Sequence, residues 1–354
     1  MTGAVDLVIV GLHGHTHIGG SLARAAEKLR VKHAFVDAGQ AFAAPRLVRA
    51  VTWRLGGHRP PALQRTSREV VAACMRWRPR WLLTTGLAPV DAAALVAIGR
   101  LGVKRLNYLT DDPWNPSMRA EWFFEALRHY DHVFSPRRAN IGDLVRHGCG
   151  AVTYLPFGFD PELSFRQEPT TLIDRTHFAT DVTFVGGADR DRVPYVDALL
   201  RAGLHVGLYG GYWDRFSETR GRGRGHADLA TLRQATSAAR VSLCLVRRAN
   251  RDGHVMRSLE IPAMGGCLLA EDTDEHRSLF GPPGDAAVYF HSIQQMLDKL
   301  RWLLSAEDER VRLAVTAYRR IRAGRHTYED RLRTMLALEA EDSGSAKHPR
   351  TARA

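Results

Sequence analysis

The chain has 354 residues, of which 45% are hydrophobic and 25% are charged, and its formal net charge is +12. This composition is typical of a globular protein with enough apolar residues for two packed domains, and no apolar run approaches the roughly 20 residues that span a bilayer. The positive charge is spread along the chain without one dense stripe, which argues against specific nucleic-acid binding and favours attraction of anionic ligands or an anionic membrane surface.

Short apolar runs alternate with helical periodicity through the first half of the chain. Strands are predicted at residues 6–10, 34–37, 81–84, 105–109, 132–135 and 152–155. Helical spacing of apolar residues fills several gaps, at residues 21–29, 67–77 and 137–146. This alternation predicts a parallel sheet with crossover helices.

A polar, proline-containing stretch at residues 160–180 interrupts this pattern, and a second series follows it. Its strands are predicted at residues 182–185, 205–209, 241–246, 267–270 and 287–290, followed by helices at 293–304, 307–323 and 328–341. We therefore expect an α/β protein with two doubly wound, Rossmann-like domains, at residues 1–160 and 175–340. Residues 343–354 lack a core-forming pattern and predict a disordered basic tail.

Ligands of such sheets bind beyond the carboxyl ends of the strands, and the loop after the first strand carries His13, His15 and His17. The loop does not form the G-x-G-x-x-G pattern of dinucleotide-binding proteins. Alternate spacing in a glycine loop also does not preorganise three metal ligands. Neither NAD nor a metal is therefore expected. The widely spaced cysteines, without a C-x-x-C pair, predict buried reduced thiols. The lack of a membrane-spanning run and of a signal-peptide pattern predicts a cytoplasmic protein.

Asp111 and Asp112 follow the predicted strand at residues 105–109 and precede Pro113. Two neighbouring carboxylates that share a proton would supply a base for an acceptor hydroxyl. Alternatively, Asp111 caps or braces a loop that Pro113 stiffens. Both interpretations remain open at the level of the sequence.

The segment Asp189-Arg190-Asp191 fits the D-x-D pattern by which some glycosyltransferases hold Mn²⁺ on the donor diphosphate. It follows Gly186 and Gly187 at an expected helix start, where Asp is a common cap, so no metal is expected there. Arg190 and Arg192 are better suited to neutralise a leaving diphosphate, because a guanidinium donates two hydrogen bonds to phosphate oxygens.

Residues 250–276 are the most informative segment. A short helix is predicted at residues 257–264, with Glu260 near its middle and Gly265-Gly266 at its end. A carboxylate on this helix can accept hydrogen bonds from a ribose diol, and the start of the helix suits a diphosphate. Asp252 lies eight residues before Glu260.

This acid-x7-acid spacing resembles the E-x7-E motif of two-domain (GT-B) glycosyltransferases, with Asp252 in place of the first Glu. Together with other segments, it resembles the spore-maturation (CgeB-like) glycosyltransferases over roughly residues 100–335. The segments that carry the resemblance are residues 108–114, 155–161, 181–187, 190–192, 206–213 and 326–331.

The resemblance implies a GT-B fold whose C-terminal domain is like that of glycosyltransferase families 1 and 4. It implies a bacterial, metal-independent hexosyltransferase that uses a nucleotide-diphosphate sugar and no further cofactor. Glu260 would hold the ribose, Arg192 and Arg257 the phosphates, and Asp252 or His254 the sugar or its developing charge. The residues expected to complete the site are Gly186, Gly187, Arg190, Gly265 and Gly266 at the donor, and Asp111 with His17 or His15 in the interdomain cleft.

The sequence leaves the acceptor open among carbohydrate, lipid, protein and small molecule. Two other functions fit the same cleft, namely a GT-B-type nucleotide-sugar epimerase and a catalytically silent nucleotide- or polysaccharide-binding protein. An epimerase would release the nucleoside diphosphate without any acceptor. The silent protein would follow if the shorter Asp252 had weakened the site.

Overall fold

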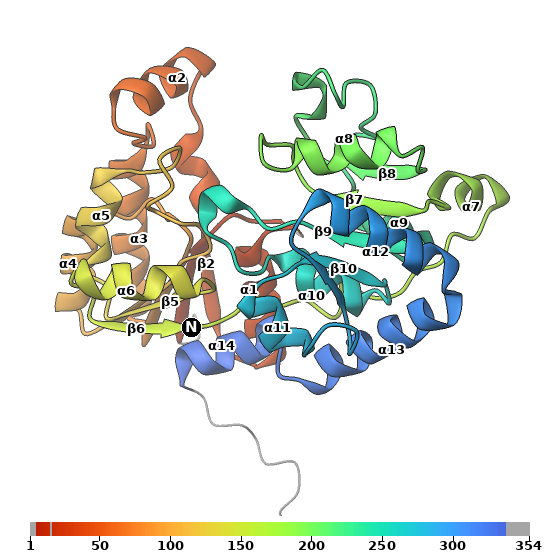
Figure 1. Cartoon of the computed structure of the whole chain (residues 1–354). Helices are drawn as coiled ribbons and strands as arrows, with labels where there is room; N and C mark the ends of the chain where they lie inside the picture. Colours follow the sequence, from red (N-terminus) through yellow and green to blue (C-terminus); the bar gives the residue numbers. More distant parts are fainter. Residues whose placement is uncertain (1–4, 15, 338–354) are drawn as a thin grey trace, which may run out of the picture.

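Two parallel β-sheets, each covered by helices, form the body of the computed structural model, which describes residues 5–14 and 16–337 (Figure 1). The first sheet has six strands in the order β2-β1-β3-β4-β5-β6. These are β1 (Leu7–Gly11), β2 (His33–Asp37), β3 (Trp81–Thr85), β4 (Lys104–Tyr108), β5 (His132–Ser135) and β6 (Ala151–Tyr154). All five residues of β1 are buried, as expected for a central strand with helices on both faces.

The second sheet has five strands in the order β11-β10-β9-β7-β8. They are β7 (Val182–Val185), β8 (Val206–Tyr209), β9 (Val241–Cys244), β10 (Leu268–Glu271) and β11 (Val288–Phe290). In both sheets the strand order departs from the chain order next to the first strand of the sheet, which is the switch point at which ligands bind in such folds.

The helices around the first sheet are α1 (Ile18–Lys28), α2 (Arg46–Leu55), α3 (Leu63–Trp77), α4 (Ala92–Arg100), α5 (Glu121–Leu127) and α6 (Arg138–Arg146). Those that follow are α7 (Leu172–Phe178), α8 (Val193–Arg201), α9 (Leu229–Ala238), α10 (Met256–Ala263), α11 (Asp274–Phe280), α12 (Ile293–Ser305), α13 (Glu307–Ala323) and α14 (Tyr328–Leu336). None of the helices in the described part of the chain combines the length and apolar composition needed to cross a bilayer.

The C-terminal helix α14 joins the two halves of the molecule. It returns to the first domain and packs against α1 (Figure 1). Leu22 of α1, Phe159 of the connecting segment, Leu259 of α10 and Leu332 of α14 are all fully buried in one hydrophobic cluster. Because burial of each such side chain contributes on the order of 2 kcal/mol, this cluster is a strong reason for the two domains to stay together.

The predicted α/β class with two doubly wound parallel sheets is confirmed. Each predicted strand is present, with ends that differ by at most two residues. Helix α7 was missed, because its seven residues lie in the polar stretch 160–180 and have only a Thr171 cap to mark them. The boundaries 1–160 and 175–340 stay predictions, and the tail at 343–354 lies outside the described residues.

Candidate active site between the two sheets

A cavity of about 390 Å³ opens beyond the carboxyl ends of the strands of the first sheet. The predicted site residues His17 and Asp111 both line it. Met256, at the start of α10, contributes from the second domain, so the cavity lies where the domains meet. The other lining residues are Leu12, Thr16, Ile18, Gly19, Ala38, Phe42, Trp53, His58, Thr85, Gly86, Leu87, Ala88, Pro89, Thr110, Met118, Ala120, Trp122 and Phe157.

His17 and Asp111 reach this cavity from the ends of two strands. His17 is exposed and immediately precedes α1, after the loop that follows β1. Asp111 follows β4, and its Oδ2 lies close to the backbone of Gly86, where a Cβ atom would be 3.0 Å away. Gly86 has a φ of +60°, which side chains rarely adopt. Glycine suits this position because it tolerates that φ and leaves room for Asp111. His15 lies outside the described residues.

Asp112 corrects the hypothesis of two carboxylates that share a proton. Its side chain is buried, and it accepts hydrogen bonds from Arg251 Nε at 2.6 Å and Arg251 Nη2 at 3.0 Å. Asn140 Nδ2 and the backbone N–H of Trp114 also donate to Asp112 Oδ1. An ion-paired carboxylate with four donors has no need of a shared proton, so Asp111 is the member of the pair that faces the cavity.

Arg192 lies at the start of α8, just beyond the end of β7, and is 7% exposed. Its Nη1 donates to the carbonyl of Gly187 at 3.2 Å and its Nη2 to the carbonyl of Leu245 at 3.1 Å. Its Nε has no hydrogen-bond partner among the described residues. Burial lowers the pKa of this guanidinium, which nevertheless stays charged at neutral pH.

The neighbouring D-x-D segment forms a turn just before α8 in this structure. Asp189 Oδ1 accepts hydrogen bonds from the backbone N–H groups of Asp191 at 3.0 Å and Arg192 at 2.9 Å. Arg190 and Asp191 are exposed. Gly186 accepts a hydrogen bond from Trp213 Nε1 at its carbonyl. Within the described residues, no group of three or more His, Cys, Asp or Glu side chains is arranged to hold a metal ion.

Helix α10 carries Arg257 and Glu260 on the side that faces the first domain. The two side chains form an ion pair one turn apart, and Glu260 is 8% exposed. They line a small pocket with Thr16, Asp160 and Tyr328, and this pocket shares Thr16 and Met256 with the 390 Å³ cavity. Burial lowers the pKa of Arg257 to about 10, so the guanidinium remains a cation at neutral pH.

Gly265 and Gly266 lie at the predicted helix end, and their assignment to the donor stays a prediction. They end α10 and precede β10, so they lie at the opposite end of the helix from its N-terminus. Gly265 has a φ of +79°, and a Cβ on Gly266 would lie 2.9 Å from side-chain atoms of Ile261 and Thr236. These glycines are required by a tight turn and close packing, and the structure does not bring them to the cleft.

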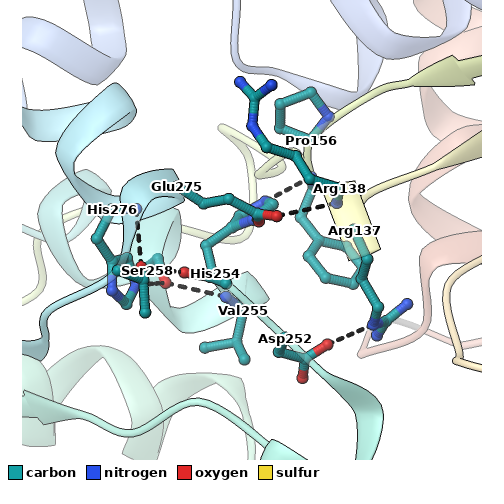
Figure 2. A network of polar contacts seen from close by, with 12 residues as sticks. Arg137, Arg138, Pro156, Asp252, His254, Val255, Ser258, Glu275 and His276 are labelled. Atoms are coloured by element: carbon teal, nitrogen blue, oxygen red, sulfur yellow. Dashed lines mark hydrogen bonds and ion pairs between the residues drawn. The ribbon is translucent and has the colours of Figure 1, made fainter. Parts of the chain in front are cut away.

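Asp252 and His254 lie in a buried network that links the two domains (Figure 2). Asp252 pairs with the guanidinium of Arg137, which is 2% exposed. His254 Nδ1 donates to Glu275 Oε2 at 2.5 Å, and its Nε2 accepts from the backbone N–H of Phe157 at 3.0 Å. Both ring nitrogens of His254 are therefore occupied in this structure, and the expected contact of His254 with the sugar stays a prediction.

The pKa shifts in this network follow from burial. Burial lowers the pKa of His254, which fits a neutral ring with its proton on Nδ1. Burial raises the pKa of Asp252 to about 6, although Arg137 acts in the opposite direction. Asp252 is thus held by Arg137 of the first domain, and its expected role at the donor sugar stays a prediction.

The sequence reasoning missed the partners that hold this interface. Arg137 follows β5 at the carboxyl edge of the first sheet, which is a position where a functional side chain is expected. Glu275 also accepts the backbone N–H of Arg138 at 3.0 Å, and Arg251 binds Asp143 as well as Asp112. Each of these residues follows a strand, and the sequence shows that position. Spacing cannot indicate their partners across the interface, because those partners lie more than 100 residues away in the sequence.

Comparisons with known proteins agree with this geometry. Residues 192–337 match a family model described as "Glycosyl transferase-like". No curated protein matches the sequence. Sucrose-phosphate synthase from Thermosynechococcus elongatus aligns with a TM-score of 0.65 and 13% identity, over 94% of this chain and 98% of that chain.

Two further structures share the fold over nearly the whole length of both chains. HepE from Anabaena, solved in complex with UDP and glucose, aligns with a TM-score of 0.64 and 13% identity, over 94% of this chain and 98% of that chain. The α,α-trehalose 6-phosphate synthase from Burkholderia multivorans aligns with a TM-score of 0.60 and 13% identity, over 95% and 96%. At this identity the similarity shows the fold. The chain therefore has a GT-B fold, and its residues 192–337 are similar to the glycosyl transferase-like family.

Proposed function

We propose that the protein transfers a glycosyl group from a nucleotide-diphosphate sugar, bound against the second sheet, to a hydroxyl of an acceptor in the 390 Å³ cavity. The observation that carries this proposal is the placement of α10. Its N-terminus opens onto the cavity through Met256, while Glu260 lines the adjoining pocket. A helix N-terminus attracts a diphosphate, and a carboxylate on the same helix accepts the hydroxyls of a ribose.

The donor would be held by cations and backbone groups of the second domain. Arg192 is buried just after β7, where its Nε lies 3.6 Å from Asp189 Oδ2 without a hydrogen bond to any described residue, and Arg257 is the cation on α10. Departure of the nucleoside diphosphate builds negative charge, which guanidinium groups and helix N–H groups stabilise. Gly186 and Gly187 let the chain turn beside this position, and the exposed Arg190 is free to approach the ligand from solvent.

The acceptor hydroxyl would lose its proton to a side chain of the first domain. Asp111 is the carboxylate of the cavity, and His17 lies at the start of α1 beside it in the lining. We assign Asp111 the role of base and His17 a contact with acceptor or donor phosphate. Asp252 and His254 then act by holding the domains together.

The finer properties proposed from the sequence are consistent with this site. Arginines and a helix N-terminus replace a metal, so the transfer is metal-independent, and we propose a hexosyl donor and membership in the CgeB-like subfamily. A cytoplasmic location and a peripheral contact with anionic membrane are also proposals, supported by the net charge of +12.

A screen of donors tests the proposed function. The purified protein is incubated with UDP-, GDP-, dTDP- and ADP-sugars, and thermal stability and release of nucleoside diphosphate are measured with and without EDTA. At least one donor should raise the melting temperature by mass action and be turned over. Activity should survive EDTA. Loss of turnover on chelation with rescue by Mn²⁺ would contradict metal independence, and the absence of any donor response would overturn the function.

A nucleotide-sugar epimerase remains the second candidate, because a putative UDP-N-acetylglucosamine 2-epimerase from Listeria monocytogenes shares the fold with a TM-score of 0.53 at 11% identity. The same screen separates the two functions. An epimerase converts or hydrolyses the donor in the absence of any acceptor, whereas a transferase is stimulated by acceptor. A catalytically silent binding protein would show a thermal shift without turnover.

A further inference from the structure

The 390 Å³ cavity has an unusual charge composition for a protein with 50 Lys and Arg residues. None of the described residues that line it is a Lys or an Arg. Its one carboxylate is Asp111. An acceptor with a phosphate or carboxylate group would find no cation here and would be repelled by Asp111.

The walls of the cavity are aromatic and apolar. Phe42, Trp53, Trp122 and Phe157 contribute rings, and Leu87 adds an aliphatic side chain. Flat apolar ligands pack well between such rings, which gain free energy from both burial and ring–ring contact. The lining therefore favours a flat ligand with a largely apolar body.

The aromatic rim is held in place by contacts between two segments of the first domain. Trp122 Nε1 donates to the carbonyl of His58 at 3.3 Å, and the ring of Trp53 packs on the ring of His58 with centroids 4.5 Å apart. His58 Nδ1 donates to the carbonyl of Arg119 at 2.6 Å. Because the polar atom of Trp122 already has its partner, its indole presents an apolar surface to the cavity.

Polar side chains in the lining are few. Besides Asp111, the cavity has His17, His58 and three threonines, and none of its described lining residues is Asn, Gln, Glu or Ser. A free sugar carries hydroxyl groups around its whole ring, and each one left without a partner on burial costs about 1–3 kcal/mol. A ligand with one hydroxyl on an apolar body avoids that cost.

We infer that the acceptor is an uncharged aromatic alcohol whose hydroxyl lies at Asp111 and whose ring lies between Trp53 and Trp122. This inference rests on the proposed glycosyl transfer. In the reaction, Asp111 takes the hydroxyl proton and the acceptor oxygen forms a bond to the anomeric carbon of the donor. The bond from that carbon to the diphosphate oxygen breaks, and the nucleoside diphosphate leaves with the electron pair.

Binding of matched fluorescent probes, measured without donor, tests the class of acceptor. The probes are 7-hydroxycoumarin and 7-hydroxycoumarin-3-carboxylate at a pH that keeps the phenol protonated, with unlabelled glucose 6-phosphate as competitor. The neutral probe should bind at least about tenfold more tightly than the carboxylate, the ratio that corresponds to roughly 1.4 kcal/mol. Equal or tighter binding of the carboxylate, or displacement by glucose 6-phosphate, would overturn the inference.

Variants of Trp53 give a second readout, because this side chain is 40% exposed and its replacement should leave the fold intact. Trp53→Ala should weaken binding of the neutral probe by up to about tenfold, and Trp53→Phe should restore most of it. Trp53→Arg should reverse the preference toward the carboxylate. Trp302→Ala, at an exposed position on α12, is the matched control and should bind like the wild type.

These measurements separate the inference from the proposed function. Normal binding of a nucleoside diphosphate, together with equal affinity for the two coumarins or no binding of either, would reject the aromatic acceptor. The proposed glycosyl transfer would then still stand. Selective binding of the neutral coumarin without any donor response would keep the ligand class and reject the transfer.

Discussion

The two walls of the cleft differ in the chemistry that they present. The wall formed by the first domain is aromatic, and no Lys or Arg occurs among its described lining residues. The wall formed by the second domain carries the Arg257–Glu260 pair and the start of α10, and Arg192 is the further cation that we propose for the donor. The difference shows that a net charge of +12 says little about either site, because recognition depends on where the cations lie.

The seam between the walls has a third character, since it consists of buried ion pairs and shared hydrogen bonds. Arg137 and Arg251 reach across it to Asp252 and Asp112. These contacts fix the position of one wall relative to the other. Breaking the seam should therefore weaken binding of both ligands, whereas a change within one wall should weaken binding of one ligand.

The largest expected effect is on stability, from removal of one partner of the buried pair in the seam. Asp252→Ala leaves the Arg137 guanidinium buried without its carboxylate, and we expect a loss of about 3–5 kcal/mol in the free energy of unfolding. Urea denaturation measures it. The double variant Arg137→Met with Asp252→Leu should lose less than Asp252→Ala alone, and additive losses would show that the pair does not act as a unit.

Next in size is the effect of Arg192 on the donor wall. Arg192→Ala should lower kcat by about 10²-fold or more, roughly 2.7 kcal/mol, with a much smaller rise in donor KM, because the charge it faces grows as the glycosidic bond breaks. Steady-state kinetics on a donor found by the screen decides this. Arg201→Ala, at an exposed position at the end of the same helix, is the control. A large rise in KM at unchanged kcat would mean that Arg192 only holds the donor.

Glu260→Gln sharpens the comparison, because it changes the charge of one wall without removing atoms. We expect donor affinity to fall by on the order of 2 kcal/mol while coumarin binding on the opposite wall stays the same. Calorimetry with the nucleoside diphosphate measures this, with the exposed Glu307→Gln on α13 as control. Unchanged donor affinity would remove Glu260 from the ribose role.

The last prediction concerns the response of three histidines with lowered pKa values to pH. Burial lowers the pKa of His254 and lowers the pKa values of His276 and His326 to about 4. Each folded pKa is below the unfolded value near 6.5, so this stability is complete above pH 6.5 and is lost as the pH falls toward 4.

Each such histidine should reduce the free energy of unfolding by up to about 1.4 kcal/mol per pH unit in that range. Urea midpoints at pH 7.5, 6.5, 5.8 and 5.0 record the trend, which should be flatter in His276→Gln. A stability that does not change between pH 6.5 and 5.0 would show that these rings are protonated in the folded protein.

The sequence predicted the strands and the positions after them well, because burial in a parallel sheet leaves continuous apolar runs such as residues 182–185. It therefore found Asp111, His17 and Arg192 at strand ends. It could not predict that Asp252 faces Arg137 and that His254 faces Phe157, because those contacts depend on how two domains meet. The sequence also placed Gly265 and Gly266 correctly at the end of α10, because a glycine pair is typical of a helix end.

The central claim is that the two walls bind different ligands, and a crystal structure with a nucleoside diphosphate and 7-hydroxycoumarin tests it most directly. The account predicts the diphosphate beside Arg192 and the start of α10, the ribose at Glu260, and the coumarin between Trp53 and Trp122. A diphosphate in the aromatic cavity, or a coumarin on the arginine-lined wall, would contradict it.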